Sequence, residues 1–177
     1  VDAGWKAVSM GIGYDENATY GSEFGAGGDL GDTFNGQNTS VYLRVPFEAA
    51  ATSSLSELML KVKYDDGFAA FLNGVRVASA NALNTLSWNS DATAGHSDGE
   101  ATTLIDFDIS EHTSLLMPGT NVLAIQGLND SLTSSDMLLA AELHGVRVAN
   151  PTIGGPGFLD SPTPGSLNGE SFGGFVS

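Results

Sequence analysis

Residues 68–78 read Phe-Ala-Ala-Phe-Leu-Asn-Gly-Val-Arg-Val-Ala and contain the clearest turn signal in the chain. Asn73-Gly74 separates two runs of β-forming residues. Both turn residues tolerate a positive φ, which the tight two-residue turn of a β-hairpin requires. We therefore expect two antiparallel strands joined at Asn73-Gly74.

Other segments alternate apolar and polar residues with the two-residue period of a half-buried strand. They cover residues 40–47, 57–64 and 104–109. In the first of them, Tyr42 and Arg44 are expected on the face away from the core. Further strands are expected over residues 5–10, 121–127 and 138–148, and one short helical turn over 110–117 with Ser110 as its N-cap.

About eight short strands separated by turn-rich loops predict an all-β fold, a two-sheet antiparallel jelly-roll sandwich. The chain has 177 residues, a length that fits one domain. We expect the domain to span residues 1–149, with a Pro- and Gly-rich linker or tail over 150–177 that packs partly on it. Two long polar loops, 13–39 and 80–101, are expected to gather at one end of the sandwich, where binding residues commonly lie.

The charge of the chain limits its partners. It has 6 Lys and Arg residues against 21 Asp and Glu, for a formal net charge of −15. Such a field repels phosphate backbones and anionic lipid headgroups, so we expect neither nucleic-acid binding nor insertion into a membrane. The acidic excess serves either solubility or the binding of Ca²⁺, which prefers oxygen ligands. The absence of cysteine excludes disulfides and thiolate chemistry.

Three ordered motifs resemble a galactose-binding-like jelly roll of large secreted bacterial multidomain proteins. They are residues 40–44 (Ser-Val-Tyr-Leu-Arg), residues 64–75 around Tyr-Asp-Asp-Gly and Asn-Gly, and residues 121–129 (Asn-Val-Leu-Ala-Ile-Gln-Gly-Leu-Asn). Residues 161–169 resemble the linker that follows this module. The resemblance implies a secreted or cell-surface location and neighbouring domains in a parent protein. It also implies one of two functions, carbohydrate binding or the bracing of neighbouring domains.

A carbohydrate site needs an aromatic face for the sugar ring and polar groups for its hydroxyls. The candidates lie in the two long loops and are Trp88, Tyr14, Tyr20, Asn89 and Asp91. The alternative for Trp88 is a residue that pins its loop to the sandwich. For Tyr14 and Tyr20 the alternative is burial in the core.

A calcium site would need oxygen ligands from separate loops. The candidates are Asp66, Asn129, Asp130 and Asp136. Their alternative role is local, because Asp65 or Asp66 and the polar loop 129–136 also suit turns in which side chains accept backbone N–H groups.

The sequence gives little support for catalysis. His96, His112 and His144 are scattered and lack metal-ligand spacing, and nucleophile-elbow and phosphate-loop motifs are absent. We therefore predict a non-catalytic carbohydrate-binding module that targets a secreted bacterial protein to polysaccharide or oligosaccharide. The alternative is a structural spacer or adhesion module without glycan affinity.

Overall fold

The computed structural model describes residues 4–49 and 55–147, and its regular secondary structure is mostly β-strand. The strands are β1 (Ile12–Asp15), β2 (Ser40–Ala49), β3 (Leu55–Asp65), β4 (Gly67–Leu72), β5 (Val75–Ala80), β6 (Ile105–Asp108), β7 (Gly119–Leu128) and β8 (Asp136–Arg147). The connections hold two four-residue helices, α1 (Gly31–Phe34) and α2 (Asp98–Ala101), and the 3₁₀ helix η1 (Ser110–Leu115). The predicted tail over 150–177 lies outside the described residues.

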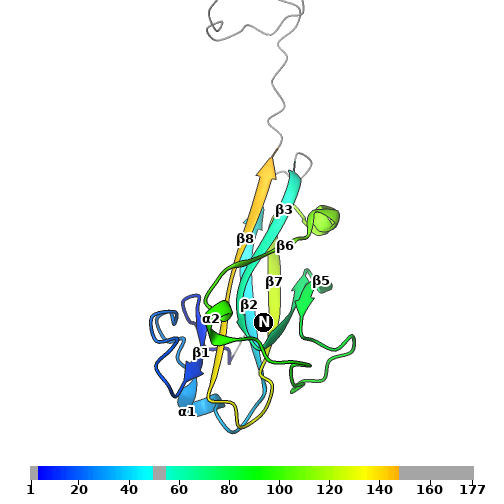
Figure 1. Ribbon diagram of the computed structural model, residues 1–177. Helices are drawn as coiled ribbons and strands as arrows, with labels where there is room; N and C mark the ends of the chain where they lie inside the picture. The colour runs from blue at the N-terminus through cyan, green and yellow to red at the C-terminus, as the bar shows by residue number, and fades with distance from the viewer. Residues whose placement is uncertain (1–3, 50–54, 148–177) are drawn as a thin grey trace, which may run out of the picture.

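The strands form two sheets of four (Figure 1). One sheet has the order β1-β8-β3-β6 and the other β2-β7-β4-β5, and every pair of neighbouring strands is antiparallel. Consecutive strands lie in different sheets at every step along the chain except from β4 to β5. The predicted two-sheet antiparallel sandwich is confirmed.

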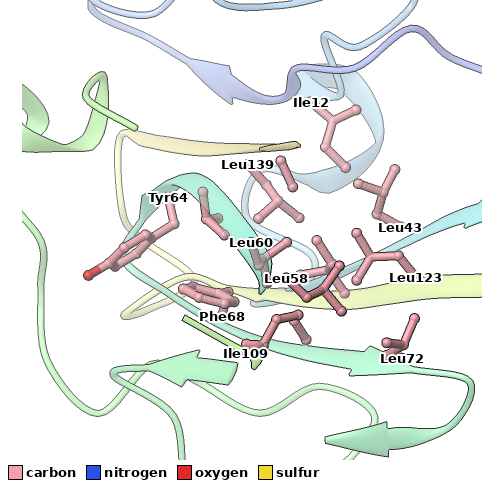
Figure 2. Packing of buried hydrophobic residues seen from close by; sticks show 14 of the residues in the cluster. Ile12, Leu43, Leu58, Leu60, Tyr64, Phe68, Leu72, Ile109, Leu123 and Leu139 are labelled. Atoms are coloured by element: carbon pink, nitrogen blue, oxygen red, sulfur yellow. The ribbon is translucent and has the colours of Figure 1, made fainter. Parts of the chain in front are cut away.

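The core lies between the sheets, and alternation along β3 shows how the sequence builds it. Leu58, Leu60 and Val62 are at most 2% exposed, while the residues between them are partly exposed. Figure 2 shows Leu58 and Leu60 of β3 packed near Phe68 and Leu123, which belong to the opposite sheet. Each fully buried aliphatic side chain contributes about 1.5–3 kcal/mol relative to an exposed one.

The hairpin predicted at Asn73-Gly74 is present between β4 and β5. Leu72 pairs with Val75, and the two turn residues have φ values of 49° and 88°. The Asn73 side chain also donates to the carbonyl of Leu115 and accepts from the N–H of Val122. The turn is therefore fixed to the start of β7 as well as closing the hairpin.

The prediction of a first strand over residues 5–10 is wrong, because the first strand is β1 at Ile12–Asp15. Residues 5–10 are mostly exposed, with Trp5 at 48% and Met10 at 38%, although Val8 packs against the core. Gly13 lets β1 approach β8, since a Cβ there would lie 1.8 Å from the Met137 carbonyl oxygen. A residue with a side chain cannot take this place without moving the strands apart.

The predicted N-cap role of Ser110 is also wrong. The residue before η1 is Ile109, and no side chain caps the helix. Instead, the Ser110 hydroxyl donates to the Asp108 carboxylate at 2.6 Å and accepts from the N–H of Leu58 at 3.1 Å. Ser110 therefore ties η1 to β3.

Candidate functional site

The two long loops meet at the end of the sandwich where β1, β3 and β7 finish and β8 begins, as the sequence predicts (Figure 1). Asn89 from the second loop bonds to Thr39 at the end of the first. Tyr20 from the first loop packs with Ala101 of α2 and with Leu138 of β8. The connection from β5 to α2 is therefore the element that covers this end.

Trp88 is the most exposed large apolar side chain of the described residues, at 73%. Its backbone is nevertheless held firmly. The Tyr42 hydroxyl donates to the Trp88 carbonyl at 2.7 Å, and the Gln126 amide donates to the Ser87 carbonyl at 2.9 Å. The loop thus crosses the outer face of the sheet at β2 and β7, with the indole directed to solvent.

Asn89 supplies the main anchor of this loop. Its side-chain oxygen accepts the N–H groups of Thr39 at 2.9 Å and Ser40 at 3.1 Å. Both residues are buried, so these donors need a partner. Asn89 and Tyr42, rather than the indole, pin the loop. Asp91, further along, is exposed and free to meet a ligand from solvent.

Tyr14 and Tyr20 lie inside the sandwich end and do not offer a ring face to a ligand. They are 2% and 0% exposed. The Tyr14 hydroxyl donates to the Ser134 carbonyl and accepts from the Asn129 amide, both at 2.8 Å. Both tyrosines are therefore core residues, which was the alternative to sugar binding, and neither lies with Trp88 in a shared surface.

A cluster of carboxylates occupies the same end. Asp65, Asp66 and Asp136 are buried, at 3%, 6% and 7% exposed. Carboxylate oxygens of Asp65, Asp136 and the exposed Asp98 lie within 4.8 Å of one another. We call these last three residues the acidic triad. Their positions follow from β3 ending beside the start of β8, while α2 brings Asp98 from the second long loop.

Burial makes the ionisation of Asp65 and Asp136 costly. Burial, and next the negative charge of Asp66, raises the pKa of Asp65 to about 8. The Tyr20 hydroxyl, which donates to Asp65 at 2.9 Å, opposes this pKa shift. Burial likewise raises the pKa of Asp136, with the charges of Asp98 and Asp15 adding to it. Either a proton or a cation can relieve this repulsion, and carboxylate oxygens are the ligands that Ca²⁺ prefers.

The residues predicted to ligate a metal are mostly engaged elsewhere. The Asp66 carboxylate accepts the N–H groups of His96 at 3.0 Å and Asp130 at 2.7 Å. The Asn129 side chain bonds to Tyr14 and to the N–H of Asp130, and Asp130 is exposed outside the triad. Of the four candidates, only Asp136 belongs to the acidic triad.

Sequence reasoning did not assign Asp65 and Asp98 to the site. Asp65 shares the Tyr-Asp-Asp-Gly motif with Asp66, but local sequence does not show which carboxylate faces β8. The register does, because Asp65 pairs with Leu138, two residues from Asp136. Nothing in the sequence around Asp98, apart from its place in a long polar loop, indicates that it belongs to an acidic cluster.

The histidines occupy three separate surroundings. His96 stacks on Tyr64 with ring centroids 4.3 Å apart, and its Nδ1 lies 2.8 Å from the Tyr64 carbonyl oxygen. His112 lies beside Glu111, and His144 bonds to Glu142. His96 therefore packs the second long loop against β3.

Comparison with known protein families and with curated proteins finds no match to this chain. Among the described residues, no helix has the length and apolar character needed to cross a membrane.

Proposed function

We propose that this sandwich is a non-catalytic carbohydrate-binding module that holds a larger secreted protein on a polysaccharide. The single observation that carries the proposal is Trp88, 73% exposed on a loop whose backbone is tied to β2 and β7. An indole offers an apolar face to a pyranose ring and an N–H donor to a hydroxyl.

Preorganisation supports the proposal. A ligand that stacks on a mobile loop must first order it, which costs affinity. Here the hydrogen bonds of Asn89 and Tyr42 fix the loop before any ligand arrives. The exposed indole keeps its ring face available to a ligand, and a sugar would meet it without any rearrangement of the loop.

Affinity electrophoresis in gels containing soluble polysaccharides, with a glycan array to choose them, tests the proposal. Trp88→Ala should weaken binding at least about tenfold, as truncation of a central aromatic contact does. Its melting temperature should change by no more than about 2 °C, because the indole is largely exposed.

Leu83→Ala is the matched control, because Leu83 is a 53% exposed apolar residue of the same loop. Its affinity should stay within about twofold of the wild type. A folded wild type that binds no glycan, or equal losses in the two variants, would contradict the proposal.

A second candidate function, a spacer or adhesion module, is favoured by the opposite end of the sandwich. An apolar pocket of about 390 Å³ opens there between the sheets, lined by residues that include Phe47, Leu55 and Leu143. Exposed apolar surface of this kind suits contact with a neighbouring domain. Absence of glycan binding in the test above would favour this function.

A further inference from the structure

The apolar pocket at the end of the sandwich opposite the long loops has a volume of about 390 Å³. β8 ends beside the start of β3 at this end, where Arg147 pairs with Leu55 (Figure 1). Leu55, Gly145 near the end of β8 and Ala49 at the end of β2 all line the pocket. The pocket therefore opens at the point where the chain leaves β8.

The core is not closed at this end. Phe47, Leu55 and Leu143 pack against the core but remain partly exposed. Leu60 and Leu139, which lie deeper in β3 and β8, are fully buried. Apolar surface that stays in water forgoes the stabilisation that its burial would give, so an apolar group that covered these side chains would stabilise the fold.

The pocket suits an uncharged apolar segment. Glu48 is the one charged residue among the described residues that line it, and its side chain is exposed. The Thr120 hydroxyl on the neighbouring strand donates to the Glu48 carboxylate at 2.5 Å. This bond holds the charge on the outer side of the sheet, so the space between the sheets is apolar.

The sequence that follows β8 contains such a segment. Residues 148–159 read Val-Ala-Asn-Pro-Thr-Ile-Gly-Gly-Pro-Gly-Phe-Leu and include no charged residue. The glycines and the proline at 154–157 permit a reversal of the chain, and Phe158-Leu159 follow directly. The step from Arg147 to Phe158 is eleven residues and can span up to about 36 Å. Gly145, on the pocket wall, precedes Arg147 by only two strand residues, or about 7 Å.

We propose that Phe158-Leu159 dock into this pocket and close the core of their own chain. Adjacent side chains of an extended segment point to opposite sides, so one meets the sheet of β2 and the other the sheet of β8. An apolar cavity of about 150 Å³ holds one benzene ring, so the pocket has room for both side chains. The inference does not depend on the proposed carbohydrate-binding function, because Trp88 lies on the other long loop end of the sandwich.

Other occupants fit less well. Residues 50–54, which connect β2 to β3, read Ala-Ala-Thr-Ser-Ser and offer no large apolar side chain. A second copy or a separate protein must bind from solution. A segment tethered next to the pocket acts at a local concentration in the millimolar range, so a contact too weak to join two molecules is still formed within one.

The first test measures melting temperatures of the full chain. Phe158→Ser, Leu159→Ser should lower the melting temperature by at least about 3 °C, because the pocket loses its apolar cover. Leu167→Ser, Phe172→Ser is the matched control, since it makes the same two kinds of change further along the chain. Its melting temperature should stay within about 1 °C of the wild type.

The second test measures access to the pocket. The chain has no cysteine, so Ala49→Cys places a single thiol on the pocket wall. A maleimide should label it at least about fivefold more slowly with the native Phe158-Leu159 than with the two serines, because docked side chains cover the thiol. Asp91→Cys, at an exposed position in the second long loop, is the control and should label at the same rate in both backgrounds.

Three outcomes would overturn the inference. Equal melting temperatures together with equal labelling rates would leave the pocket open to a neighbouring domain. An equal loss of stability in the control pair would mean that Phe158-Leu159 are not the docking residues. Protection of the thiol that disappears on a roughly tenfold dilution of the protein would assign the pocket to a second copy.

Discussion

Asparagine in place of Asp65 keeps the shape of the side chain and removes its titration from the buried end of the sandwich. In the folded chain the pKa of Asp65 is about 8, against an ordinary value of 3.8. Between these two pH values the folded chain holds a proton that the unfolded chain releases. The free energy of unfolding therefore falls as pH rises across this range, and the stability present at low pH is lost by about pH 8.

The size of the effect follows from proton linkage. One proton contributes about 1.4 kcal/mol per pH unit, so wild-type stability should drop by about 3 kcal/mol between pH 5 and pH 7 from Asp65. Asp65→Asn should remove this slope. Asparagine can still accept the Tyr20 hydroxyl and donate to Asp66, as the protonated acid does. The variant should therefore be more stable at pH 7, by on the order of 4 kcal/mol, because by then the wild type has held the proton over about three pH units above the ordinary value of 3.8.

Urea unfolding at half-unit steps from pH 5 to pH 7.5, in buffer with EDTA, measures this difference. The pKa of Asp136 is also raised, so the wild-type curve contains a second contribution of the same sign. The difference between wild type and variant isolates Asp65. Asp91→Asn, an exposed carboxylate in the same long loop, controls for the change in net charge. Parallel curves for wild type and Asp65→Asn would refute the reasoning.

Two further predictions concern the same end of the sandwich. If Ca²⁺ relieves the repulsion in the acidic triad, millimolar CaCl₂ should raise the melting temperature of the EDTA-treated chain, and at a hundredfold excess over the dissociation constant the free energy of unfolding should rise by about 2.7 kcal/mol. Asp98→Asn should lose most of this gain. A melting temperature that does not change on adding Ca²⁺ would show that the triad does not bind it. Asn89→Ala leaves the buried N–H groups of Thr39 and Ser40 without an acceptor. Urea unfolding should therefore show a free energy of unfolding lower by about 1–3 kcal/mol, and affinity electrophoresis should show weaker glycan binding. Unchanged stability would mean that other contacts anchor the loop.

The sheets could be predicted because each long strand buries one face. In β2 and β3 the apolar residues recur every second position, and the side chains at these positions are buried or partly buried in the structure. The segment 5–10 has no such face, and its expected strand is absent. β1 is short and depends on Gly13 approaching β8, a contact between residues more than 120 positions apart. Local patterns carry no information about such a contact.

The candidate site depends on the same kind of distant contact. The exposure of Trp88 is set by hydrogen bonds from Tyr42 and Gln126, each about 40 or more positions away along the chain. The composition of the loop marks Trp88 as a candidate but does not show which way it points. The acidic triad joins the end of β3 to the start of β8, so strand register, and not sequence spacing, brings Asp65 near Asp136.

The second long loop, residues 80–101, carries both the indole of Trp88 and the carboxylate of Asp98, yet the two are held by separate anchors. Asn89 ties the loop to β2 directly after Trp88. Further on, the N–H of Ala92 bonds to the carbonyl of Asn129, and the N–H of His96 bonds to Asp66. These bonds lie between α2 and Trp88 along the chain, so a movement of α2 would have to pass through them to reach the indole. We therefore expect a change in the charge of Asp65 to act on stability rather than on the position of Trp88.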